Sequence, residues 1–304
     1  MMDNVLTLIC DPAAAGLTVD DTRAAAAGIG ESDGSAAEPD WLAAGIACDL
    51  PFAAEDLQSV AAAVRARLVG RPVDIVMQAS AGRRKRLLVA DMESTIIENE
   101  MLDELAAARG IGEAIADITA RAMAGELDFE GALKARVEML RGLPANALEE
   151  SLVAIRITPG AATLVATMRA NGAYCALVSG GFLFYTGWIR ERLGFDYDQA
   201  NRLEFNNGKL TGAVTDPILG RDAKREALLR LAVERGLTPN DAITVGDGAN
   251  DLAMLETAGT GVAFRAKPIV AERAKARIDY GDLTALLYLQ GYRRDEFRDS
   301  NSGI

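Results

Sequence analysis

The chain has 304 residues, of which 50% are hydrophobic, and a formal net charge of −12. This length suffices for one large domain or two ordinary ones with a sizeable core, and the charge argues against nucleic acid or an anionic membrane as a partner. The sequence contains no histidine, which excludes Ser-His-Asp and Cys-His hydrolases and most catalytic zinc sites and leaves carboxylates, hydroxyls, Lys, Arg and hard metal ions for any chemistry.

The first 80 residues are predicted to form a small α+β domain. Its expected strands are residues 5–9, 41–50 and 73–77. Residues 55–68 have apolar side chains at helical spacing, whereas residues 11–40 are rich in Ala, Gly, Asp and Ser and have weak periodicity. The basic run at residues 82–86 marks a junction, and in so acidic a chain it favours a solvated strand entry over a nucleic-acid patch.

Strand and helix patterns alternate from residue 86 onward. The expected strands are residues 86–91, 173–179, 241–247, 260–264 and 276–279. Helical patterns separate most of them, which predicts a parallel sheet with helices on both faces. Residues 98–156 indicate several helices, so a helical subdomain is expected between the first two strands. The sequence Asn-Asn-Gly-Lys at residues 206–209 predicts the turn of a β-hairpin.

The predicted fold class is α/β, a Rossmann-like, doubly wound parallel sheet with an inserted helical cap and a small N-terminal α+β domain. The predicted divisions are residues 1–80 for the N-terminal domain, 81–296 for the sheet domain, about 98–158 for the cap and 297–304 for a C-terminal tail. Ligands of open α/β sheets bind beyond the carboxyl ends of the strands. We therefore expect the functional site at that edge.

Polar residues follow three of the five expected strands. They are Asp91, Glu93 and Thr95 after the first strand, Ser179 and Gly180 after the second, and Asp247, Asn250 and Asp251 after the third. Lys224 lies between the second and third strands, near the start of a predicted helix. Because the carboxyl ends of parallel strands meet at one edge of a sheet, these groups are expected to converge.

This set of residues suits phosphoryl transfer. Aspartate is a known nucleophile for phosphorus and gives an aspartyl-phosphate, and Mg²⁺ favours one or two carboxylates together with phosphate oxygens. Asp91 and Asp247 can supply those carboxylates, with the main-chain oxygen of Glu93 as a third ligand. The remaining donors to phosphate would be the Ser179 hydroxyl, the Gly180 amide and the Lys224 ammonium. Glu93 is placed to protonate the leaving alkoxide and later to activate water.

Each motif also has a structural explanation. Asp247 and Asp251 can cap a helix and stabilise its positive end, Ser-Gly-Gly is usually a turn, and a single Lys224 is more often a surface residue. A carboxylate pair after one strand is weak evidence by itself. The occurrence of all four motifs in this order, three of them at strand ends, is what favours a catalytic site.

The motifs resemble the haloacid dehalogenase (HAD) superfamily of phosphotransferases, which has a D-x-D-x-T strand end, a strand-terminal Ser or Thr, a later Lys and a G-D-x-x-x-D. The runs DMESTIIENEMLDELA, MAGELDFEGALKARVEMLRGL, VSGGF and VGDGANDLAMLETAG are similar to the phosphoserine phosphatase family, over about residues 86–290. Residues 1–80 resemble the N-terminal extension of bacterial members, related to ACT domains. The resemblance implies a HAD-like core and Mg²⁺-dependent hydrolysis of O-phospho-L-serine, the last step of serine biosynthesis.

The resemblance also implies roles for individual residues. Asp91 would be the nucleophile, Asp247 a magnesium ligand, and Glu100 would face the ammonium and carboxylate region of the substrate. Phe129 and Arg136 would close over the substrate, and Arg136 would bind its carboxylate. Alternatively, Phe129 can be only a core residue of the cap, and Arg136 only a surface residue of a helix. The phosphate would be bound by Ser179, Gly180 and Lys224. Asn250 and Asp251 would support the phosphate, the metal ion and the lysine, and Thr95 would also have a supporting role.

Glu93 departs from the family pattern, which normally has Asp at this position. Its side chain is one methylene longer, and a misplacement of about 1 Å can cost on the order of a hundredfold in rate. Three outcomes stay open: local backbone compensation, a slower enzyme, or altered chemistry. Because an acid is retained, the sequence still favours a phosphatase.

Two other functions remain open at this stage. The substrate can be another small phosphorylated amino acid, or serine can accept the phosphoryl group; alternatively, the chain is an amino-acid-responsive regulator with weakened activity. Cys10, Cys48 and Cys175 lack metal-ligand spacing and are typical of a reducing cytosol, so a cytoplasmic location is expected. Neither a signal peptide nor a membrane-spanning segment is predicted, and the oligomeric state, including a homodimer, is left open.

Overall fold

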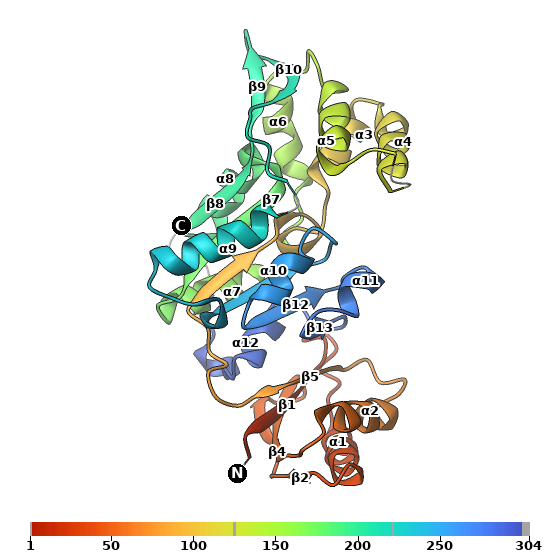
Figure 1. Cartoon of the computed structure of the whole chain (residues 1–304), viewed down its shortest axis with the longest axis vertical. Coiled ribbons are helices and arrows are strands. Elements are labelled where there is room, and N and C mark those ends of the chain that lie inside the picture. Colours follow the sequence, from red (N-terminus) through yellow and green to blue (C-terminus); the bar gives the residue numbers. More distant parts are fainter. Residues whose placement is uncertain (1, 124–125, 221, 300–304) are drawn as a thin grey trace.

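The computed structural model describes residues 2–123, 126–220 and 222–299. The predicted C-terminal tail therefore lies outside the described residues from residue 300 onward. Figure 1 shows a small N-terminal unit at one end, an α/β body in the middle, and a group of helices with a β-hairpin at the other end. The expected fold class is confirmed, whereas its exact divisions stay a prediction.

The N-terminal unit is an antiparallel sheet with two helices. Its strands are β1 (Asn4–Ile9), β2 (Ser35–Ala36), β3 (Asp40–Ala43), β4 (Ala47–Ala53) and β5 (Asp74–Ala79), and its helices are α1 (Val19–Glu31) and α2 (Leu57–Arg67). The strand order is β2-β4-β1-β5, with β3 also paired to β4. Alternate residues of β1 and β4, such as Leu6, Leu8 and Leu50, form an apolar core with residues of both helices.

Two expectations for this unit need correction. Residues 41–50 were expected as one strand, but they span the antiparallel pair β3 and β4, because Gly45 adopts a positive φ of 72° and reverses the chain. Helix α1 lies in a segment with no predicted element. Its small residues gave little periodicity, but they let it approach α2, since a Cβ at Gly28 would lie 2.9 Å from the Val64 backbone. A capping box between Thr18 and Asp21 begins the helix.

The central sheet is parallel, and its strand order is β13-β12-β11-β6-β7-β8. The strands are β6 (Leu87–Ala90), β7 (Tyr174–Phe182), β8 (Tyr197–Asn201), β11 (Ala242–Gly246), β12 (Thr260–Phe264) and β13 (Ala276–Ile278). Five of them match predicted strands. β8 was missed because its polar sequence, Tyr-Asp-Gln-Ala-Asn, has the composition of an edge strand and not of a buried one.

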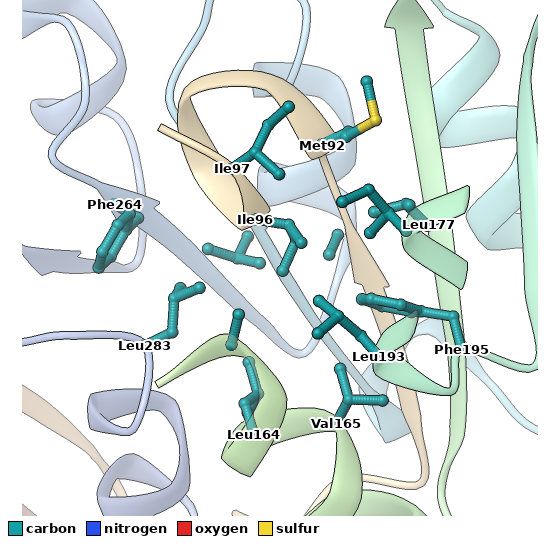
Figure 2. Packing of buried hydrophobic residues seen from close by; sticks show 14 of the residues in the cluster. Met92, Ile96, Ile97, Leu164, Val165, Leu177, Leu193, Phe195, Phe264 and Leu283 are labelled. Atoms are coloured by element: carbon teal, nitrogen blue, oxygen red, sulfur yellow. The ribbon is translucent and has the colours of Figure 1, made fainter. Parts of the chain in front are cut away.

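Helices cover both faces of this sheet. Helices α7 (Ala161–Ala170), α8 (Leu183–Leu193) and α12 (Ala285–Leu289) share one apolar cluster with Leu88 and Leu177. Figure 2 shows part of this cluster, where Leu164 and Val165 of α7 and Leu193 of α8 point into one apolar region. Helices α9 (Ala223–Glu234), α10 (Leu252–Thr257) and α11 (Pro268–Ala271) share the other cluster with Leu87 and Val89. Burial of both faces explains why residues 87–90 are wholly apolar.

The chain between β6 and β7 forms the expected group of helices. After the turn η1 (Met92–Ile96), these helices are α3 (Met101–Ala108), α4 (Gly112–Met123), α5 (Phe129–Glu138) and α6 (Asn146–Ser151), followed by η2 (Leu152–Ala154). The segments that enter and leave this cap pair with each other through Ile97 and Ile157.

The predicted hairpin is present as β9 (Leu203–Asn206) and β10 (Lys209–Val214). Its second strand is hydrogen-bonded to the cap loop, because Gly142 N donates to Leu210 O and Leu210 N donates to Leu143 O. Figure 1 shows the hairpin beside α5 and α6. The hairpin therefore joins the cap to the chain between β8 and α9, in addition to the two cap linkers.

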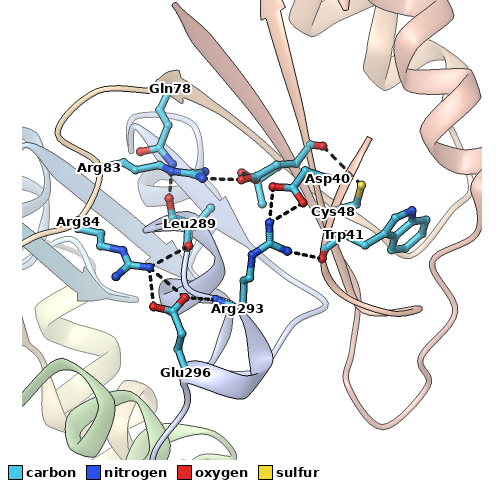
Figure 3. Close-up of polar contacts among 12 residues, drawn as sticks. Asp40, Trp41, Cys48, Gln78, Arg83, Arg84, Leu289, Arg293 and Glu296 are labelled. Atoms are coloured by element: carbon cyan, nitrogen blue, oxygen red, sulfur yellow. Dashed lines mark hydrogen bonds and ion pairs between the residues drawn. The ribbon is translucent and has the colours of Figure 1, made fainter. Parts of the chain in front are cut away.

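Polar contacts dock the N-terminal unit on the central domain (Figure 3). Arg83 pairs with the buried Asp49 at 2.6 Å, and Arg293 pairs with Asp40 at 2.7 Å near η4 (Arg294–Glu296). The carboxylate of Asp74 accepts the backbone N–H groups of residues 279–281. The basic run at residues 82–86 was expected to be solvated, but Arg83 is an interface residue with only 20% of its side chain exposed.

The chain of the central domain also contains the short turn η3 (Pro239–Asp241), directly before β11. Within the described ranges, no helix combines the length and the apolar character that crossing a membrane requires.

Gly261 of β12 provides a test of how tightly α10 packs on the sheet. A Cβ there would lie 2.0 Å from the Leu255 carbonyl oxygen, a backbone atom that cannot move alone. We expect Gly261→Ala to lower the free energy of unfolding by about 2–3 kcal/mol in urea denaturation. The matched change Gly30→Ala, in helix α1 with nothing within 4 Å, should stabilise the fold by about 0.5–1 kcal/mol. Equal effects of the two changes would contradict this packing.

Candidate active site

The site lies where the strand order reverses. β6 is flanked by β7 on one side and β11 on the other, and all three strands run in the same direction. The connections after β6 and after β11 therefore leave the sheet on different sides and open a crevice at its carboxyl edge. Asp91 follows β6 directly, and Asp247 follows β11 directly.

Asp91 is held in one orientation by its surroundings. It is 5% exposed, and its Oδ1 accepts the N–H of Met92 at 2.7 Å. The turn that follows is tight, since Ser94 has a φ of 53°, in the left-handed region. Thr95 closes this turn but lies away from the cavity; its side chain is buried, and its Oγ1 has no hydrogen-bond partner among the described residues.

Lys224, the second residue of α9, is the buried cation of the site. Its Nζ lies 2.7 Å from Asp91 Oδ1 and 2.5 Å from Asp251 Oδ1, and the lysine is 4% exposed. Burial favours the neutral amine, but Asp251 and Asp91 together raise the pKa of Lys224 above its ordinary value, so it stays an ammonium. Both carboxylate oxygens of Asp251 accept hydrogen bonds, because its Oδ2 accepts the N–H of Gly248 at 3.0 Å.

One ammonium faces three carboxylates. Asp91, Asp247 and Asp251 each offer an oxygen, and these oxygens lie within 4.8 Å of one another. Burial and Asp251 raise the pKa of Asp91 well above its usual range, and burial and Asp251 raise the pKa of Asp247 to about 6. A bound divalent cation would relieve this repulsion and restore both carboxylates to the charged form. The donor set therefore fits a hard divalent metal ion.

Glu93 reaches the start of the cap. Its Oε1 accepts the N–H of Met101, the first residue of α3, at 2.8 Å. The extra methylene relative to Asp therefore serves a contact with a helix N-terminus. Burial and the nearby Glu100 raise the pKa of Glu93 to about 8. At neutral pH this carboxyl group is mostly protonated in the metal-free protein and can donate a proton.

Ser179 and Gly180 line the same crevice from inside β7, which was expected to end at residue 179 but continues to Phe182. The pairing of β7 with β8 is irregular between Val178 and Phe182. Ser179 is 2% exposed, and its Oγ accepts the N–H of Gly181 at 2.9 Å. A Cβ at Gly180 would lie 3.3 Å from the Phe129 ring, and one at Gly181 would lie 2.6 Å from the Glu93 carboxylate. A side chain at either position would crowd Phe129 or Glu93, and Phe129 brings the cap close to the sheet edge.

A cavity of about 600 Å³ lies between the sheet edge and the cap. Nine of the predicted residues contribute to its wall: Asp91, Glu93, Glu100, Phe129, Arg136, Ser179, Gly180, Asp247 and Asn250. Lys224 lines a small adjoining pocket with Asn250, Ser179 and Gly180. Glu100 is exposed, and its Oε1 accepts a hydrogen bond from the Ser94 hydroxyl at 2.7 Å. Asp251 and Thr95 are buried and do not reach either cavity.

Sequence reasoning missed part of the cavity wall. Lys267 lines it from the loop after β12, and its N–H donates to the Asp247 carbonyl at 3.1 Å. Residues that follow parallel strands were expected to line the site, as Asp247 does. The same expectation applies to Lys267, because residues 260–264 were predicted as a strand. The cap residues Leu102, Asp103, Thr119, Leu127, Ala132 and Leu133 carried no such signal.

Comparison with known proteins agrees with this geometry. The family model described as haloacid dehalogenase-like hydrolase matches residues 88–256, more than half of the chain. The chain therefore belongs to the haloacid dehalogenase-like hydrolases. A haloacid dehalogenase family hydrolase from Salmonella enterica serovar Typhi has a similar structure over 95% of this chain and 98% of its own, with a TM-score of 0.83 and 28% identity.

Two other relatives are named more specifically. A phosphoserine phosphatase from Streptomyces coelicolor is 40% identical over 92% of this chain and 69% of its own length. The solved structure of a probable phosphoserine phosphatase from Vibrio cholerae matches 97% of this chain and 88% of its own, with a TM-score of 0.78 and 30% identity. Further curated relatives from Archaeoglobus fulgidus and Vibrio cholerae are matched over 63% and 60% of their lengths.

The carboxylate cluster predicts that divalent cations stabilise the fold. We expect MgCl₂ to raise the thermal unfolding midpoint by several degrees, because an ion that binds only the folded state adds its binding free energy to stability. Asp247→Asn should remove most of this shift, whereas Asp3→Asn, an exposed carboxylate in the N-terminal unit, should retain it. An unchanged shift in Asp247→Asn, measured by scanning calorimetry, would contradict the assignment of this ligand.

Proposed function

We propose that this chain hydrolyses O-phospho-L-serine to L-serine and phosphate through an aspartyl-phosphate on Asp91. One observation carries the proposal: the wall of a single cavity includes a strand-end aspartate paired with a buried lysine, together with an arginine and a glutamate from the cap. These groups match the phosphate, carboxylate and ammonium of a phosphorylated amino acid. The names of relatives at about 40% identity support the same substrate.

The first half-reaction follows from the position of Asp91. A carboxylate oxygen of Asp91 attacks phosphorus, the bond from phosphorus to the serine oxygen breaks, and the leaving oxygen takes the proton of Glu93. The Ser179 hydroxyl, the Gly180 amide and the Lys224 ammonium donate to the phosphoryl oxygens, where negative charge develops. Asn250 and Asp251 keep the phosphate and Lys224 in place.

The second half-reaction uses the same residues in reverse. Glu93 is now a carboxylate and takes a proton from water, the water oxygen attacks phosphorus, and the bond to Asp91 breaks. Phosphate leaves, and both carboxyl groups return to their starting states. The Met101 N–H holds Glu93 throughout, so the proton is taken and returned at one place.

We propose Mg²⁺ as the divalent ion of the site, held by Asp91, Asp247 and the main-chain oxygen of Glu93. When bound, it neutralises the charge that keeps an anionic phosphate away from two carboxylates. Among the three clustered aspartates, Asp251 is the poorest metal ligand, because both of its carboxylate oxygens already accept hydrogen bonds, from Lys224 and Gly248.

The cap supplies the groups that select the amino acid. Arg136 can hold the substrate carboxylate in a two-pronged pair, and Glu100 can hold its ammonium. Phe129 excludes water from the reacting atoms, since its ring already covers Gly180. The proposed location is the cytoplasm, which suits three cysteines that are all free and buried.

Phosphate release from O-phospho-L-serine tests this function. We expect turnover that needs Mg²⁺, stops with EDTA and falls by at least about a thousandfold in Asp91→Asn, which lacks the nucleophile. Asp3→Asn should retain the full rate. Absence of turnover with phosphoserine, while O-phospho-L-threonine or another phosphate ester is hydrolysed, would overturn the substrate. No turnover of any ester would favour a regulatory protein.

Glu93 gives a second prediction from the same mechanism. Glu93→Asp should keep kcat within about tenfold, because the acid is retained although its contact with Met101 is lost. Glu93→Gln should lose most turnover and accumulate phosphorylated Asp91, detected as a mass increase on the intact protein. Equal phosphate release by the wild type and Glu93→Gln would refute the acid/base role.

A further inference from the structure

Asn201 is a buried polar residue at the root of the hairpin, next to the active site but not in its wall. It is the last residue of β8 and is 2% exposed. Its Nδ2 donates to the Gly180 carbonyl at 2.9 Å, and its Oδ1 accepts the N–H of Leu219 at 2.8 Å. Only this orientation of the side-chain amide satisfies both partners, because one offers an oxygen and the other an N–H.

The Gly180 carbonyl belongs to the peptide plane that also carries the Gly181 N–H. In a planar trans peptide these two groups point in opposite directions. Asn201 holds the carbonyl on one side, and the N–H on the other side donates to Ser179 Oγ at 2.9 Å. The orientation of this single peptide therefore links Asn201 to the Ser179 hydroxyl.

The contact with Gly181 decides what the Ser179 hydroxyl can do. Its oxygen already accepts a hydrogen bond, so its own hydrogen remains available to donate to a phosphoryl oxygen. A rotated peptide would remove that N–H and let the hydroxyl turn away. Gly180 and Gly181 have no side chains whose packing could fix this peptide, so the hydrogen bond to its carbonyl restrains its orientation.

The second contact of Asn201 extends the effect toward the lysine. Leu219 and Gly220 line the small pocket with Ser179, Gly180 and Lys224. The Leu219 N–H bond holds this segment shortly before α9 begins at Ala223. One buried amide thus spans the two segments that flank the phosphate-binding groups.

We propose that Asn201 is a positioning residue that orients the Ser179 hydroxyl for donation to the transferring phosphoryl group. The inference rests on the proposed phosphatase activity, but it does not depend on which alcohol carries the phosphate. Asn201 touches no reacting atom; it acts through the Gly180–Gly181 peptide. Because the hydroxyl stabilises charge that develops during transfer, loss of Asn201 should lower kcat more than it raises KM.

A double-mutant cycle tests whether Asn201 acts through Ser179. Asn201→Asp keeps an acceptor for the Leu219 N–H, but it has no N–H for the Gly180 carbonyl and places a charge opposite it. We expect Asn201→Asp to lower kcat about tenfold in the wild type and by less than about threefold in Ser179→Ala, where no hydroxyl is left to orient. Asn171→Asp, an exposed residue at the end of α7, is the matched control and should retain the wild-type rate.

The cycle is measured with both O-phospho-L-serine and p-nitrophenyl phosphate at saturating Mg²⁺, beside the thermal unfolding midpoint of each variant. Equal losses from Asn201→Asp in both backgrounds would overturn the proposal, because the residue would then act independently of Ser179. Asn201→Ser is the second variant. If neither variant folds, the positioning proposal is overturned, because Asn201 then has a purely structural role. Activity on p-nitrophenyl phosphate alone would reject the proposed substrate while the cycle still tests Asn201.

Discussion

The site depends on the repulsion between three carboxylates at the edge of a parallel sheet and on one buried ammonium that only partly offsets it. Lys224 bridges Asp91 and Asp251, and all three side chains are buried. Coulomb energies between such groups are several times larger than in water. Asp247 adds a third carboxylate beside this pair, and burial together with Asp251 raises its pKa to about 6. The fold thus retains an unsatisfied negative charge, and that charge attracts a divalent ion and the phosphate that accompanies it.

The sheet itself could be predicted because its strands are buried on both faces. Residues 87–90 alternate between two apolar clusters, so the whole run is hydrophobic and its polar ending is conspicuous. The same logic failed for β8, an edge strand with polar side chains, and for α1, whose small residues serve close helix packing. Gly45, which splits residues 41–50 into two strands, gave a turn signal that was outweighed by the apolar residues around it.

The site was predictable to the extent that its residues follow strands. Asp91 and Asp247 directly follow the adjacent strands β6 and β11, and Ser179 lies near the carboxyl end of β7, so their convergence follows from sheet topology. The contact of Glu93 with Met101, eight positions further along the chain, could not be predicted, because it depends on where the cap helix begins after the turn η1. The role of Asn201 could not be predicted either. Position 180 becomes its neighbour only through the pairing of β7 with β8, and position 219 only after the hairpin returns the chain to the end of β8.

The hairpin β9–β10 changes how the helical cap can move. A cap joined by two linkers alone could swing about a single axis through Ile97 and Ile157. Here Leu210 is bonded on both sides to the cap loop, at Gly142 and Leu143, so the hairpin and the cap travel as one body. The root of the hairpin is the segment clamped by Asn201. A cap movement that opened the cavity would therefore also pull on the end of β8 at Asn201, which is hydrogen-bonded to Gly180 beside Ser179. Access to the site and alignment of its phosphate-binding groups would then change together.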